Sequence, residues 1–216
     1  MDFLLGLLQL IGVHTILGLS AYVVLQTGQV TMAQAGFFSI GAYIAAMLTA
    51  LAGWHILPAL LVGAMAAGIV AGLVGFPALR VKGLMLVVAT VAFGEFIRLF
   101  WFNFDYQIAK GDILIGPEGG EGFKQIRFFP ENGWTTGEVA LFIWVFVILI
   151  MAALWWVDRS RAGAVLRAVG TDEMAAQSSG INLTKVKVTA FAAGGFIAGI
   201  GGAIYAHYTT HIEHLN

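Results

Sequence analysis

Two charged side chains stand within a segment that is otherwise apolar and long enough to cross a membrane. Glu95 and Arg98 are three positions apart, so on a helix they share one face. Ionisable groups inside a membrane are costly and commonly mark the path of an ion or a substrate. The pair can also be purely structural, with Arg98 reaching toward the outer headgroups. We favour the structural interpretation and keep Glu95 and Arg98 as a candidate intramembrane ion pair.

Histidines offer a second possible chemistry. His207, His211 and His214 fall at i, i+4 and i+7, which brings three imidazoles to one helical face, and Glu213 lies beside them. Imidazole and carboxylate groups are zinc ligands. The cluster lies where the last apolar segment ends, so we predict no metal site there. His14, alone in the first apolar segment, is expected to hydrogen-bond between packed helices rather than to contact a substrate.

The chain lacks the other residue patterns that carry catalysis. It has no Cys, which excludes disulfides, thiolate metal sites and cysteine nucleophiles. Neither a Gly-x-x-x-x-Gly-Lys phosphate loop nor a His-Glu-x-x-His zinc motif occurs. An intramembrane enzyme would need a nucleophile with a neighbouring base, or a metal cluster, and none is convincing. We therefore predict no catalytic residue, no metal and no cofactor in this chain.

The composition places these residues in a membrane protein. No Asp, Glu, Lys or Arg lies between Phe3 and Leu79, and charged residues make up 11% of the chain, against roughly 25% in soluble domains. About 20 apolar residues form one membrane-crossing helix, and the 28 glycines would let such helices pack closely. We predict one all-α, polytopic helix bundle, a single domain over residues 1–216, with six spans at about 3–25, 35–52, 57–79, 83–102, 139–157 and 188–206.

Basic residues in the loops orient this bundle. Of the 11 Lys and Arg residues, seven lie in the loops that join the third span to the fourth and the fifth to the sixth: Arg80, Lys82, Arg159, Arg161, Arg167, Lys185 and Lys187. The positive-inside rule makes that side cytoplasmic. The loop from Asn103 to Glu138 then lies outside, as does the N-terminus, and it carries six acidic residues and three basic ones.

A polar but uncharged segment, Gln26–Gln34, joins the first two spans, and Gly28 breaks the helix within it. The segment is either a tight interfacial turn or an unwound stretch at membrane depth, which is tolerated only where protein covers it or where it lines a cavity. In the second case it would suit the passage of a polar solute without net charge. The candidate path residues are Gly28, Gln29, Thr31, Gln34 and Gly41.

The inner loop between the fifth and sixth spans is expected to hold a short amphipathic helix. Thr171 is the expected N-cap, with Asp172 and Glu173 in the first turn, where acidic side chains complement the helix dipole. The helix should run through Ser178 and stop at Gly180. The plain interpretation is a helix that lies on lipid headgroups, and the alternative is a coupling helix for another protein.

In this loop the sequence is similar to a known family. Residues Arg167–Asn182 resemble the cytoplasmic loop of permease subunits of the branched-chain amino acid type, which belong to ATP-binding cassette (ABC) importers. Importer permeases carry a Glu-Ala-Ala-x-x-x-Gly signature there that docks into the ATP-binding subunit. Met174 stands at the position of the glutamate, and Glu173 lies one place earlier. The residues that fit the rest of the signature are Ala175, Ala176 and Gly180.

Three further segments are similar to the same family, in the same order along the chain: Gly28–Tyr43, Leu79–Arg98 and Gly116–Gly120. The resemblance implies a multi-pass permease of the bacterial inner membrane that imports branched-chain or other hydrophobic amino acids. It implies a second permease subunit, ATP-binding cassette subunits and a periplasmic substrate-binding protein as partners, with lipid around the bundle and no nucleic acid. ATP would be bound by the partner subunits. The docking residues implied are Arg167, Asp172, Glu173, Ala175, Ala176 and Gly180.

Other interpretations stay open at this point. Related permeases carry urea, amides or aromatic acids, and a self-sufficient channel or secondary carrier is a further alternative. Thr31 and Gln34 replace residues that are commoner in the family. The family usually continues with further spans beyond Asn216 and often has one before Phe3, so the resemblance implies a partial permease whose C-terminal spans are missing.

Overall fold

Long helices dominate the computed structural model of this protein, which describes residues 2–78, 81, 83–110, 113–124, 126 and 128–212. The helices are α1 (Asp2–Leu25), α2 (Gln34–Ala50), α3 (Ile56–Ala78), α4 (Leu84–Phe102), α5 (Phe128–Glu131), α6 (Thr136–Arg159), α7 (Arg161–Thr171), α8 (Glu173–Ser178) and α9 (Leu183–Thr209). A 3-10 helix, η1 (Gly119–Glu121), and three strands, β1 (Ile108–Lys110), β2 (Ile113–Pro117) and β3 (Phe123–Lys124), lie between α4 and α5.

Each of the six predicted spans corresponds to a helix of this bundle. The helices α1, α3, α4, α6 and α9 are long and apolar enough to cross a bilayer, whereas α2 has 17 residues and is shorter. Both α6 and α9 extend several residues beyond the spans predicted at 139–157 and 188–206. Their polar ends are capped: Thr135 and Glu138 form a capping box at α6, and Asn182 caps α9. The predicted polytopic helical fold is confirmed.

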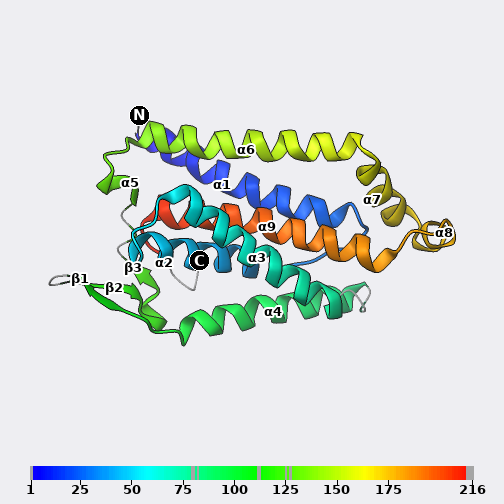
Figure 1. The fold of residues 1–216 in the computed structure, drawn as a ribbon, viewed down its shortest axis with the longest axis horizontal. Coiled ribbons are helices and arrows are strands. Elements are labelled where there is room, and N and C mark those ends of the chain that lie inside the picture. Colours follow the sequence, from blue (N-terminus) through cyan, green and yellow to red (C-terminus); the bar gives the residue numbers. More distant parts are fainter. Residues whose placement is uncertain are drawn as a thin grey trace.

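The central helix of the bundle is α9. Its apolar window is 67% buried, against 22–44% for the other long helices. In Figure 1, α1 and α6 lie on one side of α9, and α2, α3 and α4 lie on the other. Glycines allow this close approach: a Cβ on Gly202 would lie 1.8 Å from the Phe38 carbonyl oxygen of α2, far below any contact that a real Cβ makes.

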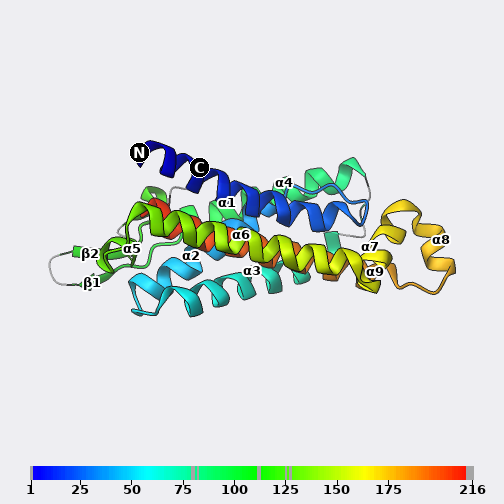
Figure 2. The ribbon, with the colours of Figure 1, turned by 90° about the horizontal axis from the view of Figure 1, so that it is seen from above.

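The two ends of the bundle carry different structures (Figures 1 and 2). At the end that we call the outer end, residues 103–138 form α5 and an antiparallel sheet of order β1-β2-β3, in which Ile108 pairs with Ile115 and Gly116 pairs with Lys124. At the opposite end, the inner end, lie α7 and α8. This placement agrees with the predicted topology. The sheet was not predicted, because strands of two to five residues are too short to show a clear alternating pattern.

The helical spacing predicted for His207 and His211 is interrupted, because α9 ends at Thr209. The next residue, Thr210, has a left-handed backbone (φ 60°), so His211 leaves the helical register of His207. The imidazole of His207 is instead buried and hydrogen bonded to Thr49 Oγ1 at 2.9 Å. Within the described ranges no group of three metal-binding side chains occurs. Six residues named above lie outside the described residues: Leu79, Arg80, Lys82, Glu213, His214 and Asn216.

Candidate functional site

The inner loop folds into two helices that share one capping residue. Asp172 ends α7 and caps α8, because its Oδ1 accepts the N–H groups of Met174 and Ala175 at 2.9 and 3.1 Å. The prediction of Thr171 as the N-cap was therefore wrong by one residue. Thr171 is the last residue of α7, and its hydroxyl donates to the Arg167 carbonyl oxygen at 2.9 Å. The acidic cap also complements the positive end of the α8 dipole.

One side of α8 is fixed to the bundle. Glu173 forms an ion pair with Lys187 of α9 at 2.6 Å, and the Lys187 side chain is only 6% exposed. Ala176 is buried, and Gly180 adopts the left-handed conformation (φ 84°) that follows the helix end. These residues from the implied docking set thus hold α8 in place. Their contact with a partner protein stays a prediction.

The other side of α8 is open. Met174 is 82% exposed, although it lies in the polar inner loop, and Ala175, Gln177 and Ser178 are exposed beside it. We call these four residues the outward face of α8. A methionine side chain adapts its shape readily to a protein surface. In the sequence Met174 is only a departure from the family signature, and the fold is what places it at an exposed position beside Ala175, Gln177 and Ser178.

A polar cluster connects α7 to the end of α1. Arg167 donates from Nη1 to the Asp158 carbonyl oxygen at 2.9 Å. The Asp158 carboxylate accepts from Tyr22 Oη at 2.8 Å and from Gln26 Nε2 at 2.6 Å. Gly170 packs so closely that a Cβ there would lie 2.2 Å from the Gln26 carbonyl oxygen. The inner loop and the start of the polar segment 26–34 are therefore in direct contact.

The polar segment between α1 and α2 re-enters the bundle. In Figure 1 the connection between these helices runs back from the inner end into the bundle. Residues 29–32 form no regular structure, and the Met32 N–H donates to Thr90 Oγ1 at 3.0 Å. Thr90 is six residues (90 − 84) after Leu84, the first residue of α4, which is about 9 Å along the helix. The geometry favours the unwound stretch over the tight turn.

The candidate path residues are of two kinds. Gln29, Thr31 and Gln34 are polar and lie in or directly after the unwound stretch, and the two glutamines are each 6% exposed. The glycines make close backbone contacts instead, Gly28 with α7 and Gly41 with α9. Helix contact thus accounts for the glycines, while the role of all five residues in a path stays a prediction.

Glu95 and Arg98 form the predicted ion pair with two hydrogen bonds. Arg98 Nε lies 2.9 Å from Glu95 Oε2, and Arg98 Nη2 lies 2.6 Å from Glu95 Oε1. The side chain of Glu95 is 53% exposed and that of Arg98 is 35% exposed. Glu95 lies on the opposite side of α4 from the helix's buried residues, which are Leu86, Thr90, Ile97 and Trp101. The pair therefore faces away from the bundle.

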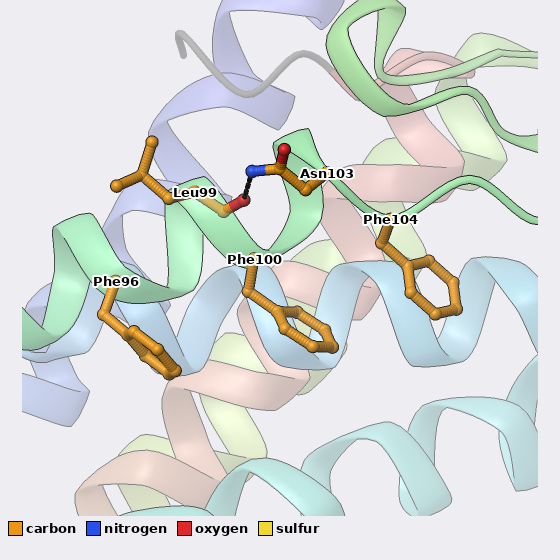
Figure 3. A pocket seen from close by; sticks show the side chains of 5 residues that line it. All are labelled: Phe96, Leu99, Phe100, Asn103 and Phe104. Atoms are coloured by element: carbon orange, nitrogen blue, oxygen red, sulfur yellow. Dashed lines mark hydrogen bonds between the residues drawn. The ribbon is translucent and has the colours of Figure 1, made fainter.

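An aromatic hollow lies on the outer half of α4. Phe96, Phe100 and Phe104 follow at four-residue spacing and point to the same side (Figure 3). With Leu99 and Asn103 they line a hollow of about 360 Å³. The Asn103 amide donates to the Leu99 carbonyl oxygen at 2.7 Å, so it is directed toward its own helix. The hollow suits an apolar contact rather than a polar solute.

These features agree with a comparison to known proteins. A family model described as "branched-chain amino acid transport system / permease component" matches residues 3–215. This chain belongs to that family. The permease is 30% identical to the high-affinity branched-chain amino acid transport system permease protein LivM of Salmonella typhimurium and to that of Escherichia coli K12. Each alignment covers 91% of the permease and 48% of the relative.

A shorter match links the permease to sugar importers. The ribose import permease protein RbsC of Haemophilus influenzae is 37% identical over 62 residues, which is 29% of the permease and 19% of the relative. No solved structure matches the chain. The permease spans about half the length of the LivM proteins that it matches. Membership in the family confirms the predicted resemblance and a multi-pass membrane protein of the transport permease class, one component of a larger system.

Proposed function

We propose that the permease is the subunit through which an ATP-driven importer moves branched-chain or other hydrophobic amino acids across the bacterial inner membrane. The proposal is supported by the contact between the inner loop and the turn that leads into the unwound stretch, made through Asp158, Gln26 and Gly170. An ATP-binding subunit docked on the outward face of α8 would thereby act on a segment of irregular backbone. Such backbone changes shape more readily than a helix does, because fewer hydrogen bonds fix it.

The polar character of the unwound stretch suits a zwitterionic solute. Gln29, Thr31 and Gln34 offer hydrogen bonds without a fixed charge, so a molecule with balanced charges meets no strong electrostatic barrier. A periplasmic binding protein would deliver this solute at the outer end. A self-sufficient carrier is less well supported, because Glu95 and Arg98 neutralise each other and face away from the bundle.

Reconstitution tests this function. The permease, its genomic partner permease and ATP-binding subunits would be placed in proteoliposomes with the substrate-binding protein. Leucine uptake should require ATP and the ATP-binding subunits, while urea uptake should stay at background. Uptake of leucine without the ATP-binding subunits would instead identify a self-sufficient carrier, and ATP-dependent uptake of urea would identify the related class of permeases.

The second permease subunit is assigned to the exposed side of α4. Glu95 lies 11 residues from the start of this helix (95 − 84) and seven from its end (102 − 95), about 16 and 10 Å from the two ends of the helix. Charged side chains at such depth face protein or water rather than lipid. A second helix bundle can cover Glu95 with polar groups and fill the aromatic hollow beside it. A lipid chain can fill the hollow, but it offers no polar group to a carboxylate.

Cross-linking tests this assignment, and the absence of native Cys makes single-cysteine variants clean. In the assembled transporter, Val91→Cys on the exposed side of α4 should cross-link to the second permease subunit. Leu141→Cys is also at an exposed position but lies on α6, across the bundle, and should not cross-link. Equal cross-linking of the two variants would show that α4 is not the preferred interface.

A further inference from the structure

The N-terminus of α2 lies inside the bundle without a side-chain cap. Its N-cap residue, Ala33, provides no side-chain acceptor, and the first bonded amide is that of Phe37, which donates to the Ala33 carbonyl oxygen at 3.2 Å. Within the described residues, the N–H groups of Gln34, Ala35 and Gly36 donate no hydrogen bond. Three free donors at the positive end of a helix dipole favour an anion.

The Gln34 side chain lies at the same place. It is 6% exposed, and neither its Nε2 nor its Oε1 finds a hydrogen-bond partner among the described residues. Helical side chains lean toward the N-terminus, so the amide of Gln34, the first residue of α2, projects past the start of the helix. A buried amide without partners calls for an explanation, and a bound ligand provides one.

We propose that the N-terminus of α2 binds the carboxylate of the transported amino acid. The donors are the three free backbone N–H groups together with Gln34 Nε2. Gln34 Oε1 and the carbonyl groups of residues 29–32, which accept no backbone hydrogen bond within the described chain, receive the ammonium group. The site thus neutralises both ends of a zwitterion with dipoles alone. Broken helices bind carboxylate groups in this way in other transporter folds.

The site is open on one side. Val30, Met32 and Ala35 are exposed, whereas Ala33 and Gln34 are buried. A ligand can therefore approach the free N–H groups from the side of the exposed residues, and the enclosed Gln34 amide has to turn toward it to bind. This inference rests on the proposed function, because it assumes that the solute carries a carboxylate. The unwound stretch and the start of α2 would then select substrates that carry a carboxylate.

Cysteine reactivity tests the site directly in the assembled transporter. At Ala35→Cys, an anionic methanethiosulfonate should react several-fold faster than a cationic one of similar size, because the helix end attracts negative charge. Leucine, added at millimolar concentration without the binding protein, should slow the anionic reagent several-fold. Leucinol, which has the same side chain but no carboxylate, should not. Leu25→Cys, exposed at the end of α1, is the control and should show neither effect.

Substitution of Gln34 provides a second readout. Gln34→Leu should lower ATP-dependent leucine uptake about tenfold or more, the size expected when a hydrogen bond to a charged group is lost. Gln34→Glu should lower it further by repelling the carboxylate, and Gln34→Asn should retain part of it. The yield of monodisperse transporter is first compared between each variant and the wild type, so that misfolding is not mistaken for lost binding.

The outcomes separate this site from the proposed function. If the wild type takes up leucine but leucinol protects as well as leucine, or reagents of both charges react alike, the carboxylate site is wrong and the transport function stands. If the wild type takes up no amino acid, the proposed function fails, and protection by a panel of other carboxylates at Ala35→Cys decides whether the helix end binds anions.

Discussion

Gly202→Leu is expected to destabilise the folded bundle strongly. The Cβ of any side chain at this position would lie 1.8 Å from the Phe38 carbonyl oxygen and 2.7 Å from its carbon, so the backbones of α2 and α9 would have to part. Overpacking of this kind costs about 1–3 kcal/mol and occasionally more. Because α9 is the central helix, we expect the upper end of that range. The measurements are the yield of monodisperse protein and the midpoint of thermal unfolding in detergent.

Glycines elsewhere in the bundle provide matched controls. A Cβ on Gly18 of α1, or on Gly94 of α4, meets nothing within 4 Å. Gly18→Leu and Gly94→Ala should therefore leave the unfolding midpoint close to that of the wild type, while Gly202→Ala should already lower it. If Gly202→Leu folded as well as Gly18→Leu, the close contact between α2 and α9 would be wrong.

The number and order of the spanning helices could be predicted because hydropathy acts over lengths of about 20 residues. Helix ends could not be placed as well, because caps decide them. The span predicted at 139–157 starts after Glu138, yet Glu138 belongs to the capping box with Thr135 at the beginning of α6. The pattern Thr-x-x-Glu was present in the sequence and could have extended the helix. Thr171 and Asp172 are both good caps, and only the structure separates them.

The contacts of the inner loop could not be predicted, because they join distant parts of the chain. Glu173 and Lys187 are 14 positions apart, and Gln26 and Asp158 are 132 apart. Sequence spacing indicates which residues share a helix face, but it does not indicate which helices meet. The unpaired amide of Gln34 is also invisible in the sequence, because glutamine usually finds a partner or water. Because the sequence does not indicate which helices meet, it could not decide whether residues 26–34 form a tight turn or an unwound stretch.

Met174→Glu is expected to release the ATP-binding subunit and thereby to abolish uptake. Met174 lies on the outward face of α8 and is 82% exposed, so the substitution removes no internal contact of the permease. In a docked complex the same side chain would lie at the interface, where an unpaired carboxylate must lose its water. The desolvation cost of such a charge is several kcal/mol, so we expect at least a tenfold loss of co-purified ATP-binding subunit and of uptake. Membrane insertion and the unfolding midpoint should not change.

Three comparisons make this result specific to docking. Met174→Leu keeps an apolar side chain of similar volume and should retain uptake. Ala162→Glu places the same charge in the exposed first turn of α7, ahead of the implied docking residues, and should have little effect. Ala176→Arg is less informative, because Ala176 is buried and the larger side chain would displace α8 itself.

The internal contacts of α8 predict a different response when they are broken. Lys187→Met removes the ion pair that joins α9 to Glu173, which should loosen α8 from α9 and lower the unfolding midpoint. Met174→Glu should instead reduce binding of the ATP-binding subunit at an unchanged midpoint. If Met174→Glu retained both the ATP-binding subunit and uptake, the outward face of α8 would not be the docking surface. The inner loop would then have to bind its partner through α7, where Arg167 and Gly170 already contact Asp158 and Gln26.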